Sequence, residues 1–515
     1  MASLQLDSTL LPCLVFLVSC IFVVATSLRK DGGVRGGAPP PSPWALPIIG
    51  NLHQLGRGHH HRKLQALARR HGPLFLLRLG SVPALVVSSP SMADAVLRTQ
   101  DHDFCSRPQP HTARGTLYGC RDIAFGPYGE RWRQLRRIAV VHLLSAKRVD
   151  SFRSLRLEEA AGFVERIRAA SAREEGGVVD VTELVISLTN TVVSRAAFGN
   201  RLGGVEPGMV RHTMKELTEL LGTIAVSDVL PWLRWVDWAT GLDARVKRTA
   251  AELDSLVERT LAEHEASRGN DDDDRDREAS DLLDSLLSIL KNGDQGFTLD
   301  RTDVKALILD MFIGGTDTIY KAIEWTMAEL VKNPREMEKV QAEVRGVAGA
   351  QGGVVLEEEL EKMILLEAAM KEALRLHPPV PLIPHETIQD TRLHGYHIPA
   401  KTRVMINAWA IGRENEWWED AEEFRPQRFT HNSASIDFSG KDSRYIPFGA
   451  GRRGCPGIVF GTRLAELTLA NMMYHFDWEL PNGQDPESFE VLESSGFAPG
   501  LKSALILAVT PRMHE

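Results

Sequence analysis

Near its C-terminus the chain carries the run Pro447-Phe448-Gly449-Ala450-Gly451-Arg452-Arg453-Gly454-Cys455-Pro456-Gly457. Its glycines lack a Cβ, so the backbone can turn tightly and approach another group closely. The proline after the cysteine suits the first turn of a helix, which the apolar segment from Ile458 to Tyr474 is predicted to form. The amides and dipole at that helix N-terminus would lower the pKa of Cys455. The run therefore suits a thiolate held against a flat anionic cofactor, with Arg453 facing a carboxylate; a buried cysteine in a glycine-rich loop is the alternative.

Residues 448 to 457 match F-x-x-G-x-R-x-C-x-G at every fixed position. This is the haem-binding signature of the cytochrome P450 family, so the chain resembles that family. The resemblance implies a mostly α (α+β) fold, with the haem between a long central helix and the helix after the cysteine loop, and with small β-sheets. It also implies haem b (iron-protoporphyrin IX) whose iron takes Cys455 as its axial ligand, with further cofactor contacts from Phe448, Gly449, Arg453 and Gly457.

A second motif lies inside a predicted helix from Asp303 to Lys332, which Asn333-Pro334 should end. The motif is Gly314-Gly315-Thr316-Asp317-Thr318. Two glycines in mid-helix cost roughly 1 kcal/mol each relative to alanine, so either close helix packing or a functional site should offset that cost. The motif resembles the oxygen-activating A/G-G-x-D/E-T of the family. That resemblance assigns Thr318 to hydrogen bonding of dioxygen and water, and Asp317 to the proton relay.

Two further motifs appear in family order. Glu372 and Arg375, three residues apart on one helix face, resemble the E-x-x-R pair, and Arg428 matches the later arginine of a buried charged triad. The alternative for the pair alone is a surface ion pair. Trp132-Arg133-Gln134-Leu135-Arg136-Arg137 resembles the W-R-x-x-R helix, in which Trp132 and Arg136 share a face and would bind a haem propionate. Arg133, Arg137 and Arg452 are predicted to form a basic docking face for a reductase; a generic basic helix is the alternative.

One position departs from the family pattern. Plant relatives usually carry arginine where this chain has His385, in the run Ile383-Pro384-His385-Glu386. Histidine can donate a hydrogen bond, but its charge depends on pH, so its binding to a propionate stays open. The resemblance also predicts the residues that line an apolar substrate pocket: Leu117, Phe312, Gly314, Val380, Ile383 and Phe497.

Composition agrees with a large enzyme. The chain has 515 residues, 43% of them hydrophobic, and a formal net charge of −8, which argues against nucleic-acid binding. Its five cysteines form no CxxC pair, so a disulfide framework is not expected and the folded part should face a reducing compartment. The run His59-His60-His61 is interpreted as a solvated basic loop rather than a metal site.

The N-terminus predicts membrane attachment. Leu10 to Leu28 is almost wholly apolar and is followed by Arg29 and Lys30, which favours an uncleaved anchor with a cytosolic body; a cleaved signal peptide is the alternative. The predicted organisation is an anchor at 1–30, a Gly/Pro-rich hinge at 31–50 and one haem-thiolate domain at 51–515. The predicted location is the endoplasmic reticulum membrane.

The resemblance is closest to plant microsomal A-type members of specialised metabolism. It implies a monooxygenase that takes electrons from NADPH through cytochrome P450 reductase, with cytochrome b5 as a further partner, and uses O2 to oxidise a small apolar substrate. Indole-type, oxime or terpenoid substrates all fit. The alternatives are a haem-thiolate isomerase or dehydratase that does not use O2, and a non-catalytic haem sensor or carrier.

Overall fold

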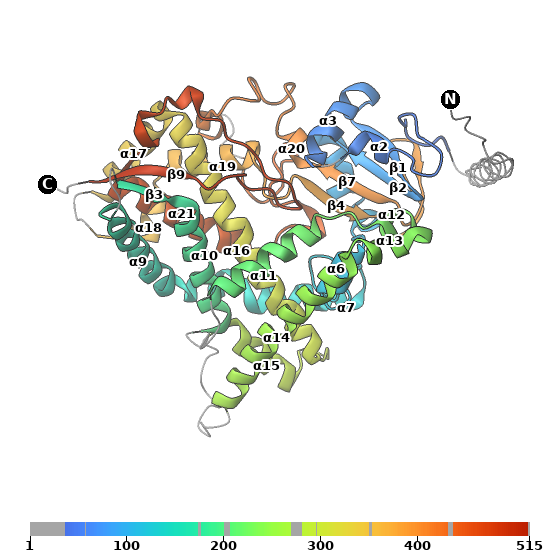
Figure 1. The fold of residues 1–515 in the computed structure, drawn as a ribbon, viewed down its shortest axis with the longest axis horizontal. Coiled ribbons are helices and arrows are strands. Elements are labelled where there is room, and N and C mark those ends of the chain that lie inside the picture. The colour runs from blue at the N-terminus through green and yellow to red at the C-terminus, as the bar shows by residue number, and fades with distance from the viewer. Residues whose placement is uncertain are drawn as a thin grey trace, which may run out of the picture.

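The structure is a computed structural model that describes residues 37–56, 58–173, 177–199, 207–268, 281–294, 296–349, 353–430 and 436–512. A helix-rich body occupies one side of the molecule, and a small sheet with short helices occupies the other (Figure 1). This arrangement confirms the predicted mostly α fold with small sheets.

Long helices build the body. They are α9 (Arg153–Ser171), α10 (Val181–Phe198), α11 (Pro207–Leu221), α14 (Leu242–Arg268), α15 (Leu282–Asn292), α16 (Arg301–Lys332), α17 (Pro334–Ala348), α19 (Ile364–Leu376) and α21 (Ile458–His475). Shorter helices connect them: α2 (Leu52–Leu55), α3 (His60–His71), α4 (Pro90–Asp94), α5 (Asp101–Phe104), α6 (His111–Thr116), α7 (Glu130–Ile138), α8 (Ala146–Ser151), α12 (Val226–Val229), α13 (Arg234–Ala239), α18 (Glu357–Leu360) and α20 (Ala408–Ile411).

Helix α16 runs through the centre and packs against α10, α19 and α21. It begins two residues earlier than predicted, because the Asp300 side chain accepts from the Asp303 amide and Asp303 returns a bond to the Asp300 amide, which forms a capping box. Its end at Lys332, before Asn333 and Pro334, agrees with the sequence prediction. The helix is continuous through Gly314 and Gly315.

The largest sheet has the order β1-β2-β7-β4. Its strands are β1 (Leu74–Leu79), β2 (Val82–Val87), β4 (Leu382–Glu386) and β7 (Arg403–Asn407), and only the β2–β7 pair is parallel. Strands β1 and β2 form an antiparallel hairpin, and β2 contains Pro83. This proline is tolerated because β7 pairs with β2 only from Ala84 onward. A second sheet has the order β3-β9-β8, from Val178–Asp180, Ile506–Pro511 and Phe476–Glu479, and β5 (Thr391–Leu393) pairs with β6 (Tyr396–Ile398).

The predicted N-terminal anchor lies outside the described residues. Among the residues that the structure does describe, no helix is both long and apolar enough to cross a bilayer. The described part of the predicted hinge packs onto the body: the carbonyl of Ala38 accepts from the His397 amide, and that of Pro41 accepts from the Leu76 amide at 2.8 Å.

The interpretation of residues 59–61 as a solvated loop is wrong. His60 and His61 form the first turn of α3, and His61 is buried. Its ring packs on Trp409 with centroids 5.0 Å apart. His61, which the sequence analysis placed in solvent, is therefore buried against the apolar surface of Trp409.

Candidate active site

The cysteine loop wraps tightly before α21. The Cys455 amide donates to the Phe448 carbonyl at 2.9 Å, and the Gly457 amide donates to the Cys455 sulfur at 3.3 Å. Gly451 has a φ of 67°, and a Cβ there would lie 2.1 Å from the Leu97 carbonyl oxygen, so only glycine fits. Helix α21 starts at Ile458, as predicted. The loop thus presents the sulfur at the wall of an internal cavity of about 320 Å³.

The protein groups around Cys455 do not lower its pKa as expected. Burial raises the pKa of the thiol, and the Gly457 amide and the Arg136 charge only partly oppose that rise. The reason is that one amide and one cation do not replace the water that burial removes. Coordination to a metal ion deprotonates a thiol outright, so iron binding would complete what the loop begins.

Helix α16 presents the second motif to the same cavity. Gly314, Gly315 and Thr318 border it, as Cys455 does. A Cβ at Gly314 would meet nothing within 4 Å, whereas one at Gly315 would lie 3.0 Å from the Val193 side chain of α10. Close helix packing therefore explains Gly315, and open space over the cavity explains Gly314. The Thr318 hydroxyl donates to the Gly314 carbonyl at 2.6 Å, which anchors it at the cavity wall.

Asp317 does not border the cavity and instead carries an ion pair one turn further along α16. The Lys321 ammonium lies 2.6 Å from its carboxylate and also donates to the Ala498 carbonyl at 2.5 Å. Sequence reasoning missed Lys321, although its i,i+4 spacing from Asp317 was the available signal. The acid of the predicted relay is therefore held by a buried cation.

The cavity is apolar over most of its wall. Of the predicted pocket residues, Gly314, Val380, Ile383 and Phe497 border it, with Phe125, Val193 and Ile319 in addition. The placement of Leu117 and Phe312 in the pocket is wrong. Both are buried elsewhere in the core, and Phe312 packs against Phe198 with ring centroids 6.0 Å apart. The helical repeat turns Phe312 toward α10, away from the face that carries Gly314 and Thr318.

Three arginines border the same cavity as Cys455: Arg107, Arg136 and Arg453. Arg453 donates to the carbonyls of Cys105, Ile123 and Gly126 and stacks on Trp132 at 3.9 Å. Arg453 therefore uses most of its hydrogen-bond donors on backbone carbonyls. The sequence had predicted a contact with a carboxylate instead. Arg136 lies on the Trp132 face of α7, as predicted, and donates to the Gly454 carbonyl.

Arg107 is a site residue that the sequence did not reveal. Nε and Nη1 of its buried guanidinium have no hydrogen-bond partner among the described residues. Burial, and secondarily the charge of Arg136, lowers its pKa to about 10. A buried cation with unused donors is costly unless an anion joins it. Arg107 therefore fits an anionic group of the cofactor. Haem has two carboxylates, and one of them could pair with this cation at the wall of the cavity that Cys455 also borders.

His385 does not take the place of the missing arginine, and its predicted cofactor contact is corrected. Its side chain does not border the cavity, and its Nδ1 lies 2.9 Å from the Phe104 carbonyl. A carbonyl only accepts, so Nδ1 carries the proton and Nε2 is left as an acceptor, which cannot bond a carboxylate. Burial, together with Arg107, lowers the His385 pKa well below its ordinary value. Both effects favour the neutral imidazole.

The predicted charged triad is assembled behind the cavity. Both Glu372 carboxylate oxygens accept from Arg375 at 2.8 Å, and Arg428 Nε donates to the same carboxylate at 3.1 Å. Glu372 and Arg375 are buried. Arg375 also donates to the carbonyls of Gly412 and Ala421, so the triad ties α19 to the segment that leads to the cysteine loop.

The predicted basic face is smaller than expected. Arg133 is exposed and lies over Tyr128 at 5.6 Å. Arg137 is paired with Asp294 at 2.8 Å, and Arg452 with Asp101 at 3.0 Å. Of the three predicted docking residues, Arg133 alone has no carboxylate partner within the described part of the chain.

Comparison with known proteins agrees with this geometry. The chain matches the cytochrome P450 family over residues 39–503. It is 44% identical to cytochrome P450 71A25 of Arabidopsis thaliana over 97% of this chain and 99% of that one, and 48% identical to cytochrome P450 71A1 of Persea americana over 89% and 90%. It is 42% identical to a phenylacetaldehyde oxime monooxygenase of Prunus mume over 98% and 94%.

A solved zebra fish cytochrome P450 with abiraterone matches this fold with a TM-score of 0.72 at 26% identity, covering 88% of this chain and 99% of that one. The haem is thiolate-ligated in this family, and O2 and electrons from a reductase are its co-reactants. The fold, the cysteine loop and the relatives lead to one conclusion: this chain belongs to the cytochrome P450 family and is a haem-dependent monooxygenase related to the plant 71 group.

Proposed function

We propose that the protein oxidises a small apolar compound of plant specialised metabolism, with O2 and with electrons from NADPH delivered by cytochrome P450 reductase. One observation carries this proposal. Cys455, the Gly314–Thr318 face of α16 and the apolar side chains of Val380, Ile383 and Phe497 border a single cavity. Its wall offers few polar groups to a substrate, so shape and apolar contact would select it.

Each residue has a proposed role. Haem bound through Cys455 supplies activation of dioxygen, because a thiolate ligand pushes electron density toward the iron. Arg107 and Arg136 would pair with its carboxylates, and Trp132 supports them. Thr318 would hold water and move a proton at its hydroxyl, while Asp317 would exchange protons with solvent. Phe497 and Ile383 orient the substrate and exclude water.

The test is expression in microsomes with a plant reductase. Carbon monoxide added to the reduced protein should give the red-displaced Soret band of thiolate ligation. A substrate should then displace water from iron, shift the spin state, and be oxidised with consumption of NADPH and O2. Phenylacetaldehyde oxime is a sound first candidate, because the Prunus mume relative is named for it. Conversion of an oxidised substrate without NADPH or O2 would instead favour the isomerase or dehydratase function.

Electron delivery is proposed to use Arg133. Arg133 is exposed on α7, the helix whose Arg136 donates to the Gly454 carbonyl of the cysteine loop. Arg133→Glu should therefore slow reduction by the reductase and leave reduction by dithionite unchanged. The rate should also fall at high salt, because the contact is between exposed charges. An unchanged reductase rate would remove Arg133 from the docking face. Cytochrome b5 is a proposed competitor for the same surface.

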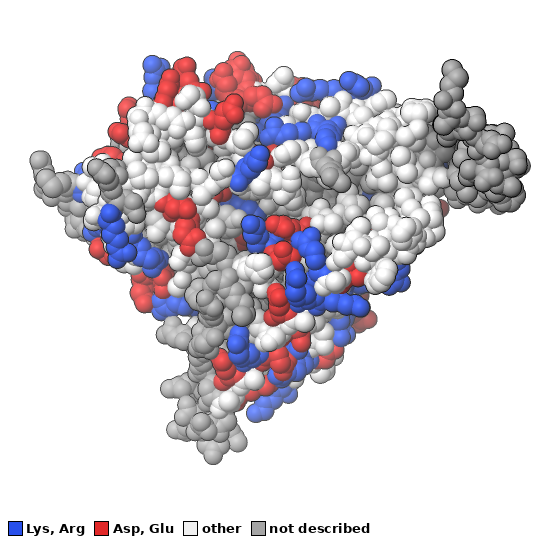
Figure 2. Space-filling view, viewed as in Figure 1, with Lys and Arg blue, Asp and Glu red and all other residues white. Residues whose placement is uncertain are grey.

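The endoplasmic reticulum membrane is the proposed location, and four exposed tryptophans support contact with lipid. Trp232, Trp235 and Trp238, on and before α13, are 52%, 63% and 74% exposed, and Trp44 is 71% exposed. The segments that carry them pack on one apolar cluster around β1 and β2, and the face over β1, β2, α12 and α13 shows few charges (Figure 2). Tryptophan prefers the membrane interface. The single-pass anchor at residues 1–30 remains a proposal.

A further inference from the structure

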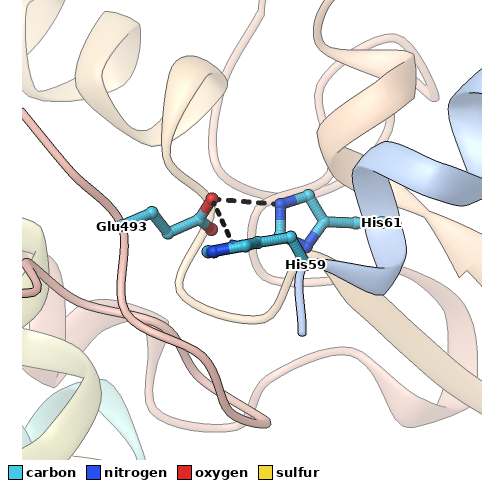
Figure 3. A group of neighbouring side chains, drawn as sticks. All are labelled: His59, His61 and Glu493. Carbon is cyan, nitrogen blue, oxygen red and sulfur yellow. Dashed lines mark hydrogen bonds and ion pairs between the residues drawn. The ribbon is translucent and has the colours of Figure 1, made fainter. Parts of the chain in front are cut away.

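A second cluster of metal-binding side chains lies outside the haem cavity. His59, which directly precedes α3, and His61, in its first turn, face Glu493 in the C-terminal loop (Figure 3). His61 Nε2 lies 3.2 Å from a Glu493 carboxylate oxygen, and His59 Nδ1 lies 3.5 Å from the same oxygen. All three ligand atoms lie within 4.8 Å of one another. Residues 434 positions apart are thus brought into one site by the fold.

These distances suit a tetrahedral cation. Zinc bonds to imidazole nitrogen and carboxylate oxygen are about 2.0–2.2 Å long, which places neighbouring ligand atoms roughly 3.3 Å apart in tetrahedral geometry. The two measured separations, 3.2 and 3.5 Å, lie on either side of that value. The third separation, between the two imidazole nitrogens, is at most 4.8 Å, so a bound cation would draw these rings together by up to roughly 1.5 Å. A site of two imidazoles and one carboxylate binds zinc in preference to calcium or magnesium.

The ligands are held in place before any ion binds. His61 packs on Trp409, and its carbonyl accepts from the Asn407 side chain at 2.8 Å. His59 has a φ of 43°, an uncommon conformation for a residue with a side chain, and it is not part of the helix. Its Nδ1 is shielded from solvent and has no hydrogen-bond partner among the described residues. His59 precedes α3, so its side chain is not bound to the helical repeat and can face the same carboxylate as His61.

The site also borders a smaller cavity, of about 200 Å³, between the histidine turn and the loop at 494–499. The Ser494 and Ser495 side chains line it, which leaves room for a water molecule as a fourth ligand. Phe497 borders both this cavity and the haem cavity. A cation that joins His59 and His61 to Glu493 would therefore restrain the loop that closes one wall of the substrate pocket.

We propose that His59, His61 and Glu493 form a divalent zinc-type cation site that clamps the C-terminal loop to α3. Arg62 is its competitor. Its guanidinium donates to the same Glu493 oxygen at 2.9 and 3.1 Å. Arg62 is 49% exposed, so it can swing to the other carboxylate oxygen or into solvent when a cation binds.

The test is zinc titration of the tag-free holoenzyme by calorimetry, with metal content measured after dialysis. We expect one zinc ion per chain beyond the haem iron, with micromolar affinity. His59→Asn should weaken binding at least tenfold, and Arg62→Gln should tighten it several-fold because a competing positive charge is removed. His60→Asn is the matched control, since His60 lies between the ligands but belongs to no cluster of three; its affinity should not change.

Two results would overturn the site. One is absence of zinc binding below about 100 μM to the intact holoenzyme. The other is an equal loss in the His59 and His60 variants, which is the behaviour of an unstructured histidine run that binds metal adventitiously. A bound cation should also raise the thermal midpoint of the wild-type protein in proportion to its concentration, and not that of His59→Asn. None of these measurements requires a substrate, so they are independent of the proposed monooxygenation.

Discussion

Replacing Arg107 by methionine should loosen the haem. The pKa of this buried guanidinium is about 10 instead of 12.5, because burial disfavours its charge. That difference corresponds to roughly 3 kcal/mol by which burial disfavours the charged form. A carboxylate that pairs with Arg107 relieves this cost and adds a charge-assisted hydrogen bond, worth about 1.5–3 kcal/mol. We therefore expect the variant to release haem on the order of 10- to 100-fold faster.

The assay is transfer of haem from the holoenzyme to excess apomyoglobin, followed at the Soret band. The matched control is His385→Gln, which keeps a donor for the Phe104 carbonyl but removes the imidazole. Because the free His385 nitrogen is an acceptor, the control should release haem at nearly the wild-type rate. If His385→Gln lost haem faster than Arg107→Met, the assignment of the carboxylate to Arg107 would be refuted.

Three further predictions concern the relay, a buried carboxyl and the membrane face. Thr318→Ala should raise the peroxide released per NADPH several-fold, because the hydroxyl at the cavity wall is lost; unchanged coupling would exclude the relay role. Burial, and secondarily Glu367, raises the pKa of Glu466 to about 8. Between about pH 4.5 and 8 the carboxyl ionises in the unfolded chain but stays protonated in the folded one, so the free energy of unfolding falls as the pH rises through this range. Glu466→Gln should thus be more stable at pH 7, by up to roughly 3 kcal/mol in denaturant titrations, and not at pH 4; a less stable variant at pH 7 would contradict this. Trp235→Ser with Trp238→Ser should bind liposomes more weakly at unchanged haem content, and equal binding would exclude this face.

The features predicted correctly from the sequence have local or closely spaced determinants. The cysteine loop depends on glycines that a tight turn needs, such as Gly451 with a φ of 67°. Helix α16 depends on a cap at one end and Asn333-Pro334 at the other. Glu372 and Arg375 lie on one helix face, so their pairing followed from spacing. In each case the physical constraint acts within a few residues.

The features that were missed depend on contacts between distant segments. Whether His385 reaches a carboxylate is decided by the Phe104 carbonyl, 281 residues away, which fixes its tautomer. Arg107 stands alone in a loop with no motif around it, and only the fold brings it to the cavity that Cys455 borders. Phe312 lies two residues before Gly314 but faces α10, because a helix turns by about 100° per residue. The predictions failed where they depended on the direction of a side chain, and not where they depended on the type of secondary structure.

The contacts of Lys321 link the proton relay to the substrate pocket. Its ammonium bonds to the Asp317 carboxylate and to the Ala498 carbonyl, and Ala498 follows Phe497 on the cavity wall. Glu324, one turn further along α16, accepts from the Leu501 amide of the same loop. Lys321 therefore joins the Asp317 carboxylate directly to the loop that carries Phe497. We expect a substrate that displaces Phe497 to shift this lysine and so to perturb the proposed relay acid.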